Sequence, residues 1–168
     1  MSHPTQPRAR ALNWSIFIVC LFVLALALAA GGCSRTPPAL IPNNDKSLRK
    51  TAREFAQDAK TRQPYKTDVP KAGTAVARAQ VGYSADQVEV VNLSDETWND
   101  VEIWVNERYV VHVAQMKPFD LKVLNFRMLY NEKNQAFPMF NTTDAKRVEK
   151  VEVLWAGQMF NVPVALAD

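Results

Sequence analysis

VEIWVNERYVVHVA, residues 101–114, is the stretch that decides the fold. Val, Ile and aromatic residues flank a short polar segment, which predicts two strands joined as a hairpin. A two-residue loop would mix Glu102 with apolar side chains on one face, whereas a loop of residues 106–108 makes one face wholly apolar. We therefore predict the three-residue loop. It pairs Val105 with Tyr109, Ile103 with Val111 and Val101 with Val113 on the apolar face, and Glu102 with His112 and Trp104 with Val110 on the other face.

Further short segments of similar composition surround this hairpin, and turn residues such as Ser94-Asp95 separate them. They are residues 87–93, 121–124, 126–130, 148–155 and 159–164. Short strands at this spacing, with no helical pattern between them, predict an all-β antiparallel sandwich over residues 81–168.

The last two segments predict a second hairpin. Ala156-Gly157 fits a two-residue turn, because Gly157 tolerates the positive φ that such a turn needs. This register places Trp155 opposite Gln158, Val153 opposite Phe160 and Val151 opposite Val162, while Glu152 and Asn161 share the other face. Pro163 has no N–H for a sheet ladder, so we expect the final strand at a sheet edge.

The N-terminus has the pattern of an export signal. Arg8 and Arg10 precede residues 14–32, an uncharged run that fits the apolar core of a secretory signal. The run is also long enough to cross a bilayer as one helix. It ends in LAAGGCS, residues 28–34, which places Cys33 directly after small residues.

These residues resemble the lipobox of bacterial lipoproteins, although Ala30 stands where a larger aliphatic residue is commonest. The resemblance implies that residues 1–32 are removed and that Cys33 becomes an acylated N-terminus, carrying palmitate or similar chains. Ser34 then implies the outer membrane. The alternative is that residues 1–32 remain as an uncleaved membrane anchor. In both cases we expect the rest of the chain in the cell envelope, facing the periplasm or the exterior and tethered to a membrane.

Charge divides the rest of the chain into a basic stalk, residues 33–80, and an acidic domain. Residues 34–80 hold ten Lys and Arg against four Asp and Glu, and residues 81–168 hold eight against thirteen. This balance argues against a nucleic-acid-binding domain, which needs a basic face on its folded part. The stalk's charge either attracts anionic lipid headgroups or docks the stalk onto the acidic domain.

Residues 45–63 of the stalk predict a helix, which Asn44 or Asp45 can cap and Pro64 ends. Its apolar residues fall on one stripe: Leu48, Ala52, Phe55, Ala56 and Ala59. This stripe either lies on lipid, as in an interfacial helix, or packs against the domain. Residues 66–80 are expected to form a linker.

Few residues of this chain could support catalysis or hold a metal. Cys20 and Cys33 lie within the first 33 residues, and the two histidines are His3 and His112. A Glu102–His112 pair could handle protons as a dyad, or it could be an ordinary cross-strand charge pair. Because no second His or nucleophile accompanies it, we predict no metal site, no cofactor and no enzymatic activity.

Aromatic residues are the other candidates for a binding site. In the predicted register Tyr109 and Trp155 belong to the core, which leaves Trp104, and with it Trp98, facing outward. Exposed aromatic side chains bind sugars or partner chains, so Trp98 and Trp104 are candidate ligand contacts. The alternative is that both are core residues, as large apolar side chains usually are.

The strand region is similar to the small immunoglobulin-like or FxLYD-like sandwich domains of bacterial lipoproteins. The residues that carry this likeness are 88–94, ending in Asn-x-Ser, the hairpin of residues 101–114, and Phe126 before a turn; the likeness covers roughly half of the chain. It implies a non-catalytic binding or scaffolding module. We therefore expect a membrane-tethered envelope protein that contacts other envelope proteins. The alternative is a carbohydrate-binding module for envelope or extracellular polysaccharide.

Overall fold

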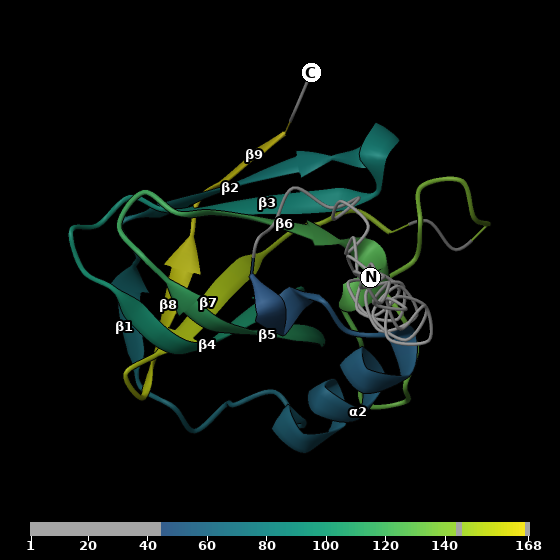
Figure 1. Ribbon diagram of the computed structural model, residues 1–168, viewed down its shortest axis with the longest axis horizontal. Coiled ribbons are helices and arrows are strands. Elements are labelled where there is room, and N and C mark those ends of the chain that lie inside the picture. The colour runs from purple at the N-terminus through teal and green to yellow at the C-terminus, as the bar shows by residue number, and fades with distance from the viewer. Residues whose placement is uncertain (1–44, 144–145, 167–168) are drawn as a thin grey trace, which may run out of the picture. The chain divides into compact units, whose positions relative to one another are not determined.

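The computed structural model describes residues 45–143 and 146–166, which are mostly β-structure in two sheets (Figure 1). One sheet has five strands in the order β1 (Lys71–Thr74), β8 (Gln158–Val162), β7 (Val151–Trp155), β4 (Trp98–Val105) and β5 (Tyr109–Met116). The other has four strands in the order β6 (Leu121–Asn125), β3 (Gln87–Asn92), β2 (Ala77–Gly82) and β9 (Val164–Leu166). Most pairs are antiparallel, and residues of both sheets share one apolar core. The arrangement is consistent with the predicted β-sandwich.

The β4–β5 hairpin has the predicted loop and register. Val105 pairs with Tyr109, so residues 106–108 form a three-residue loop, and Glu102 pairs with His112. Asn106 and Glu107 adopt φ values of 52° and 55°, which supply the left-handed turn without a glycine. The apolar alternation of the two strands was therefore sufficient to set their register.

The second hairpin also has the predicted register, with Trp155 opposite Gln158. Ala156 and Gly157 both have positive φ, 50° and 74°, as a primed two-residue turn requires. Pro163 separates β8 from β9, and the chain passes there from one sheet to the other. The predicted final strand corresponds mainly to β8, and its expected edge position is wrong, because β8 lies between β1 and β7. The short strand β9, which begins after Pro163, lies at the edge of the other sheet.

Two expectations about secondary structure are wrong. Residues 66–80 are not a linker, because they contain β1 and much of β2, which lies inside the four-stranded sheet. The folded domain therefore begins before residue 81. The buried positions of β2 are mostly alanines, which give a weak strand signal. Residues 126–130 are not a strand: η3 (Phe126–Met128) is a 3₁₀ turn, which Asn125 caps by accepting a hydrogen bond from the Arg127 N–H.

The predicted helix is shorter than expected and is preceded by a separate turn, η1 (Lys46–Leu48). The helix itself, α2 (Ala52–Arg62), begins after Thr51, which forms a capping box with Glu54. Asp45 caps η1 instead, accepting a hydrogen bond from the Ser47 N–H at 2.8 Å. Asn44 lies outside the described residues. The S/T-x-x-E signature at Thr51 was the signal that could have placed the start of α2.

The helix packs on the domain, which is one of the two alternatives that the sequence left open. Phe55 and Ala59 are buried, and Figure 1 shows α2 on the side of the five-stranded sheet that faces away from the four-stranded sheet. Residues 45–70, which we call the docked segment, therefore form a third layer.

Residues 1–44 lie outside the described residues, and with them lie the leader, the apolar run and Cys33. Export and lipidation therefore stay predictions. Among residues 45–143 and 146–166, no helix is long and apolar enough to cross a membrane.

Candidate functional site

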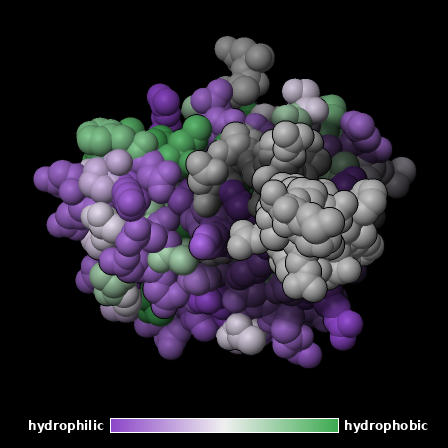
Figure 2. Space-filling view, in the orientation of Figure 1, coloured by the Kyte–Doolittle hydropathy of each residue, from purple (hydrophilic) through white to green (hydrophobic). Residues whose placement is uncertain are grey.

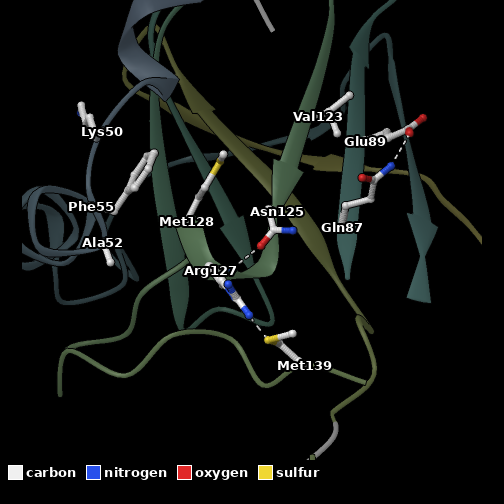
Figure 3. Close-up of a pocket in the computed structure, with 10 residues that line it drawn as sticks. All are labelled: Lys50, Ala52, Phe55, Gln87, Glu89, Val123, Asn125, Arg127, Met128 and Met139. Carbon is white, nitrogen blue, oxygen red and sulfur yellow. Dashed lines mark hydrogen bonds between the residues drawn. The ribbon is translucent and has the colours of Figure 1, made fainter. Parts of the chain in front are cut away.

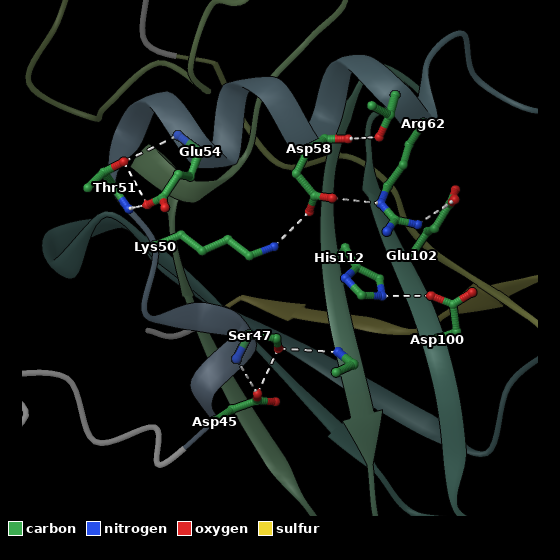
Figure 4. Close-up of polar contacts among 12 residues, drawn as sticks. Asp45, Ser47, Lys50, Thr51, Glu54, Asp58, Arg62, Asp100, Glu102 and His112 are labelled. Carbon is green, nitrogen blue, oxygen red and sulfur yellow. Dashed lines mark hydrogen bonds and ion pairs between the residues drawn. The ribbon is translucent and has the colours of Figure 1, made fainter.

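Glu102 and His112 face each other in the backbone ladder, but their side chains bind different partners (Figure 4). Glu102 Oε1 accepts a hydrogen bond from Arg62 NH1 at 3.1 Å, and its Oε2 accepts one from the Trp104 indole at 3.0 Å. His112 Nε2 lies 2.7 Å from Asp100 Oδ1. The two residues thus form no dyad, and Glu102 instead attaches the docked segment to β4.

Trp104 lies on the predicted face of β4, but the expectation that this face is open to solvent is wrong. Its side chain is 0% exposed, and the Tyr65 ring packs edge-on against it with the centroids 5.3 Å apart. Both α2 and Tyr65 belong to the docked segment, which covers this side of the sheet. Trp104 therefore offers no open platform for a ligand.

Glu152 is a buried charge that holds the same segment, and sequence analysis missed this role. Its carboxylate accepts hydrogen bonds from Tyr65 Oη at 2.6 Å, Lys150 Nζ at 2.9 Å and Lys71 Nζ at 3.0 Å. Burial alone would raise the pKa of Glu152, but these three donors outweigh it and lower the pKa. Burial and the bond to Glu152 raise the pKa of Tyr65. Two of the three donors are more than 80 positions away in the chain, so no local pattern could reveal the cluster.

The start of the docked segment is held at the edge between β5 and β6. Lys122 Nζ lies 2.7 Å from Asp45 Oδ2 and 2.9 Å from Asp120 Oδ2, and its side chain is almost fully buried. Ser47 Oγ accepts a hydrogen bond from the Ala114 N–H at 3.2 Å, and Leu48 is buried. One ion pair and the buried Leu48 side chain thus fix the segment here. The charges of this ion pair are the reverse of those expected for a basic stalk on an acidic domain, because the acid belongs to the segment and the lysine to the domain.

A hollow of about 610 Å³ lies between the start of α2 and the strands β3 and β6 (Figure 3). Phe55 and Met128 give it an apolar wall. Several of its polar groups bind one another, since Asn125 Oδ1 accepts a hydrogen bond from the Arg127 N–H, and Gln87 Nε2 donates one to Glu89. These groups do not converge on a common point in the hollow, so it shows no set of free donors or acceptors for a ligand.

A smaller cavity, of about 250 Å³, lies beneath the β1–β2 and β3–β4 connections, and Trp98 lines it. Trp98 stacks on Trp155 with the ring centroids 5.4 Å apart, and Trp155 in turn lies 6.0 Å from the Phe160 ring. Trp98 is 3% exposed, so the expectation that it faces solvent is wrong. Its indole Nε1 is buried and has no hydrogen-bond acceptor among the described residues.

The buried Asn92 side chain holds the loop that forms one rim of this cavity. The side chain is fully buried, and its Nδ2 donates to the carbonyl oxygens of Glu96 at 2.8 Å and Met116 at 3.2 Å. Its Oδ1 accepts from both the N–H and the hydroxyl of Ser94. Asn92 therefore ties the β3–β4 loop to the end of β5. The Asn-x-Ser sequence, typical of a local side-chain turn, was the available signal.

Apolar side chains gather on the surface beside this cavity, at one end of the two sheets. We call the set the apolar end patch: Val76 (62% exposed), Leu93 (41%), Phe119 (72%) and Leu121 (46%). Backbone hydrogen bonds join its loops, from the Leu93 N–H to Val76 O at 2.9 Å and from the Phe119 N–H to Asn92 O at 2.8 Å. Figure 2 shows apolar surface gathered at this end, over the β3–β4 and β5–β6 loops of Figure 1. Sequence analysis did not find this patch.

Phe119 is held in an unfavourable backbone conformation, with a φ of 60°. A bulky residue rarely adopts this left-handed region, and such strain is concentrated at functional sites. The structure thus keeps a large apolar side chain in solvent at a position where Gly or Asn would fit more easily.

Within the described part of the chain, no group of three or more His, Cys, Asp or Glu side chains could hold a metal ion. Comparison with family models, with curated proteins and with solved structures found no match to this chain.

Proposed function

We propose that the chain is an exported, membrane-tethered envelope protein whose sandwich, of the immunoglobulin-like type, is a non-catalytic module that binds another protein. The observation that carries the proposal is the apolar end patch. Contiguous apolar side chains on a folded surface mark interaction sites, whereas singly scattered ones are ordinary. The strained Phe119, the most exposed member of the patch, adds to the argument, because its backbone conformation costs stability and its side chain lies in solvent.

Charge around the patch favours a protein partner over a lipid surface. Asp95 and Glu96 are exposed on the adjoining loop, and neither carboxylate has an ion-pair partner among the described residues. Anionic headgroups would be repelled by this pair, whereas a protein with a basic rim would be attracted. The carbohydrate alternative has less support, because Trp104, one of its two candidate contacts, is covered by Tyr65.

The charged residues beneath the docked segment support a non-catalytic role. Glu102 and Glu152 are each bound to cations of residues 45–71, and His112 is bound to Asp100. The Arg62–Glu102 pair joins the docked segment to β4, and the other two pairs lie within the five-stranded sheet. Asp100 and Glu102 also line a hollow of about 380 Å³, and no Ser, Thr or Cys is among its described lining residues. The membrane tether is supported by the sequence of residues 14–34 alone.

Site-specific photo-crosslinking in the native host tests the proposal. A photoreactive phenylalanine at position 119 should capture one discrete protein, which then binds the purified chain in a one-to-one complex. The matched control is position 140, because Phe140 is also exposed, at 58%, but lies outside the patch. Phe119→Asn should lose the complex and Phe140→Asn should keep it, since Asn tolerates the left-handed conformation at position 119.

Three outcomes would contradict the proposal. Equal crosslinking from positions 119 and 140 would remove the patch as the contact. Crosslinks from position 119 to lipid alone would make the patch a membrane contact. A defined turnover by the full chain that His112→Ala abolishes would make the protein an enzyme.

A further inference from the structure

We propose that the Trp98 cavity is a socket for one apolar side chain of a bound peptide segment, whose backbone carbonyl accepts a hydrogen bond from the Trp98 indole. This inference rests on the proposed protein-binding function, and it names the place where the partner's chain enters the domain.

The size and walls of the cavity suit a single side chain. Its volume of about 250 Å³ is below the range of about 300–1,000 Å³ that sites for whole small molecules usually have. Val153, Trp155 and Phe160 supply apolar walls. A branched aliphatic or aromatic side chain would bury its surface there, at about 25 cal/mol for each Å² removed from water.

The buried indole N–H of Trp98 favours an occupant that carries a hydrogen-bond acceptor. Trp98 Nε1 has no partner among the described residues, whereas Trp104 Nε1, equally buried, donates to Glu102 at 3.0 Å. A buried donor without an acceptor costs about 1–3 kcal/mol, so an occupant that brings a carbonyl oxygen removes this cost on binding. A peptide presents such an oxygen beside every side chain.

The rim of the cavity selects the charge of the occupant. Asp95 and Glu96 are the charged residues that line it, and no Lys or Arg is among its described lining residues. An amide N–H or an amino group is therefore favoured at the rim, and a carboxylate is disfavoured. A sugar would place several hydroxyl groups against Val153 and Phe160, where they would be buried without partners.

The cavity is continuous with the apolar end patch, because Val76 belongs to both. The loop above it is held in place by Asn92, whose side chain binds Ser94 and Glu96. The loop can therefore keep its place while a side chain enters, which lowers the entropic cost of binding. The Trp98 indole has almost no accessible surface, so its ring must turn toward the cavity before the N–H can reach a carbonyl of the segment.

Nuclear magnetic resonance of the indole N–H groups tests the proposal on the full chain in detergent micelles. The chain has four tryptophans, and Trp98→Phe identifies the Trp98 signal. Leucinamide, which is cationic, should shift that signal downfield in a saturable way, as a new hydrogen bond requires. The Trp104 signal is the internal control, because its N–H already donates to Glu102. Two further compounds carry the same side chain and test the effect of charge. N-acetyl-leucinamide is neutral, and N-acetyl-leucine is negatively charged.

We expect N-acetyl-leucine to bind at least about threefold more weakly than leucinamide, as expected for exposed charges at the rim. The double variant Asp95→Asn, Glu96→Gln should remove this preference; both side chains are exposed, so the variant should fold. An unmoved Trp98 signal, equal shifts at Trp98 and Trp104, or a shift with maltose but not with leucinamide would overturn the proposal. Such a failure would leave crosslinking from position 119 intact, so it is distinguishable from a failure of the proposed function.

Discussion

Asn92 joins two loops of the domain through a single buried side chain. Replacing it with alanine would leave the carbonyl oxygens of Glu96 and Met116 without their donor and would open a small void. We expect Asn92→Ala to lower the free energy of unfolding by about 2–4 kcal/mol, measured by chemical denaturation.

Asn99→Ala is the matched control for that prediction. Asn99 is exposed, and its side-chain oxygen accepts a surface hydrogen bond from Gln115, so the free energy of unfolding should change by no more than about 0.5 kcal/mol. Equal effects of the two variants would show that Asn92 does not hold the loops.

Glu152 should make the free energy of unfolding of the domain depend on pH in the acidic range. Its pKa in the folded protein is lowered from an ordinary value of 4.5, so it contributes stability above that value, and the contribution is lost as the pH falls through the folded pKa. We expect the free energy of unfolding to fall as the pH is lowered below about 5, and Glu152→Gln to flatten this dependence while lowering stability at pH 7. Denaturation curves between pH 3 and 7 measure both effects.

The exposed Glu149→Gln variant has the same change of net charge and controls for it. An identical pH slope in both variants would exclude the proposed role of Glu152.

At the scale of elements, α2 is held to the sheet chiefly by one large side chain. Phe55 is buried, and its truncation removes most of the apolar contact of the helix. We expect Phe55→Ala to lower the free energy of unfolding by about 3 kcal/mol, measured by chemical denaturation. Arg53→Ala, on the exposed side of α2, should change stability by no more than about 0.5 kcal/mol. A Phe55→Ala variant as stable as the native chain would favour a helix that leaves the domain for the lipid surface.

Elements were predictable wherever apolar residues alternate strongly. The hairpin of residues 101–114 and the turn at Ala156-Gly157 were correct to the residue, because a shift of one position would turn every apolar side chain to the wrong face. β2 was missed because its buried positions include Ala77 and Ala79, whose small side chains carry little signal. The segment that begins at Phe126 is as apolar as a strand, but it forms a 3₁₀ turn that the Asn125 side chain caps.

At the scale of the whole molecule, the docked segment connects the predicted membrane anchor to the outer face of the five-stranded sheet. If Cys33 is the anchor, mass spectrometry of the membrane-extracted protein should find an acylated N-terminal Cys33 and no residues 1–32. Cys33→Ala should leave the precursor uncleaved and held by its own apolar run. Recovery of a chain that retains Met1 or Ser2 with an unmodified Cys33 would identify an uncleaved helix as the anchor.

The sequence by itself determined what depends on neighbours in the chain: the all-β class, the register of two hairpins, and the leader pattern before Cys33. These follow from periodicity and turn chemistry, which act over a few residues. The tertiary structure alone decided which faces are covered. Trp104 and Glu102 were placed on the correct face of β4, yet that face is buried, because Arg62 and Tyr65 lie over it from a segment about 40 residues away. Exposure of a side chain depends on what packs against it from afar, so the apolar end patch and the Trp98 cavity emerged only once the layers were assembled.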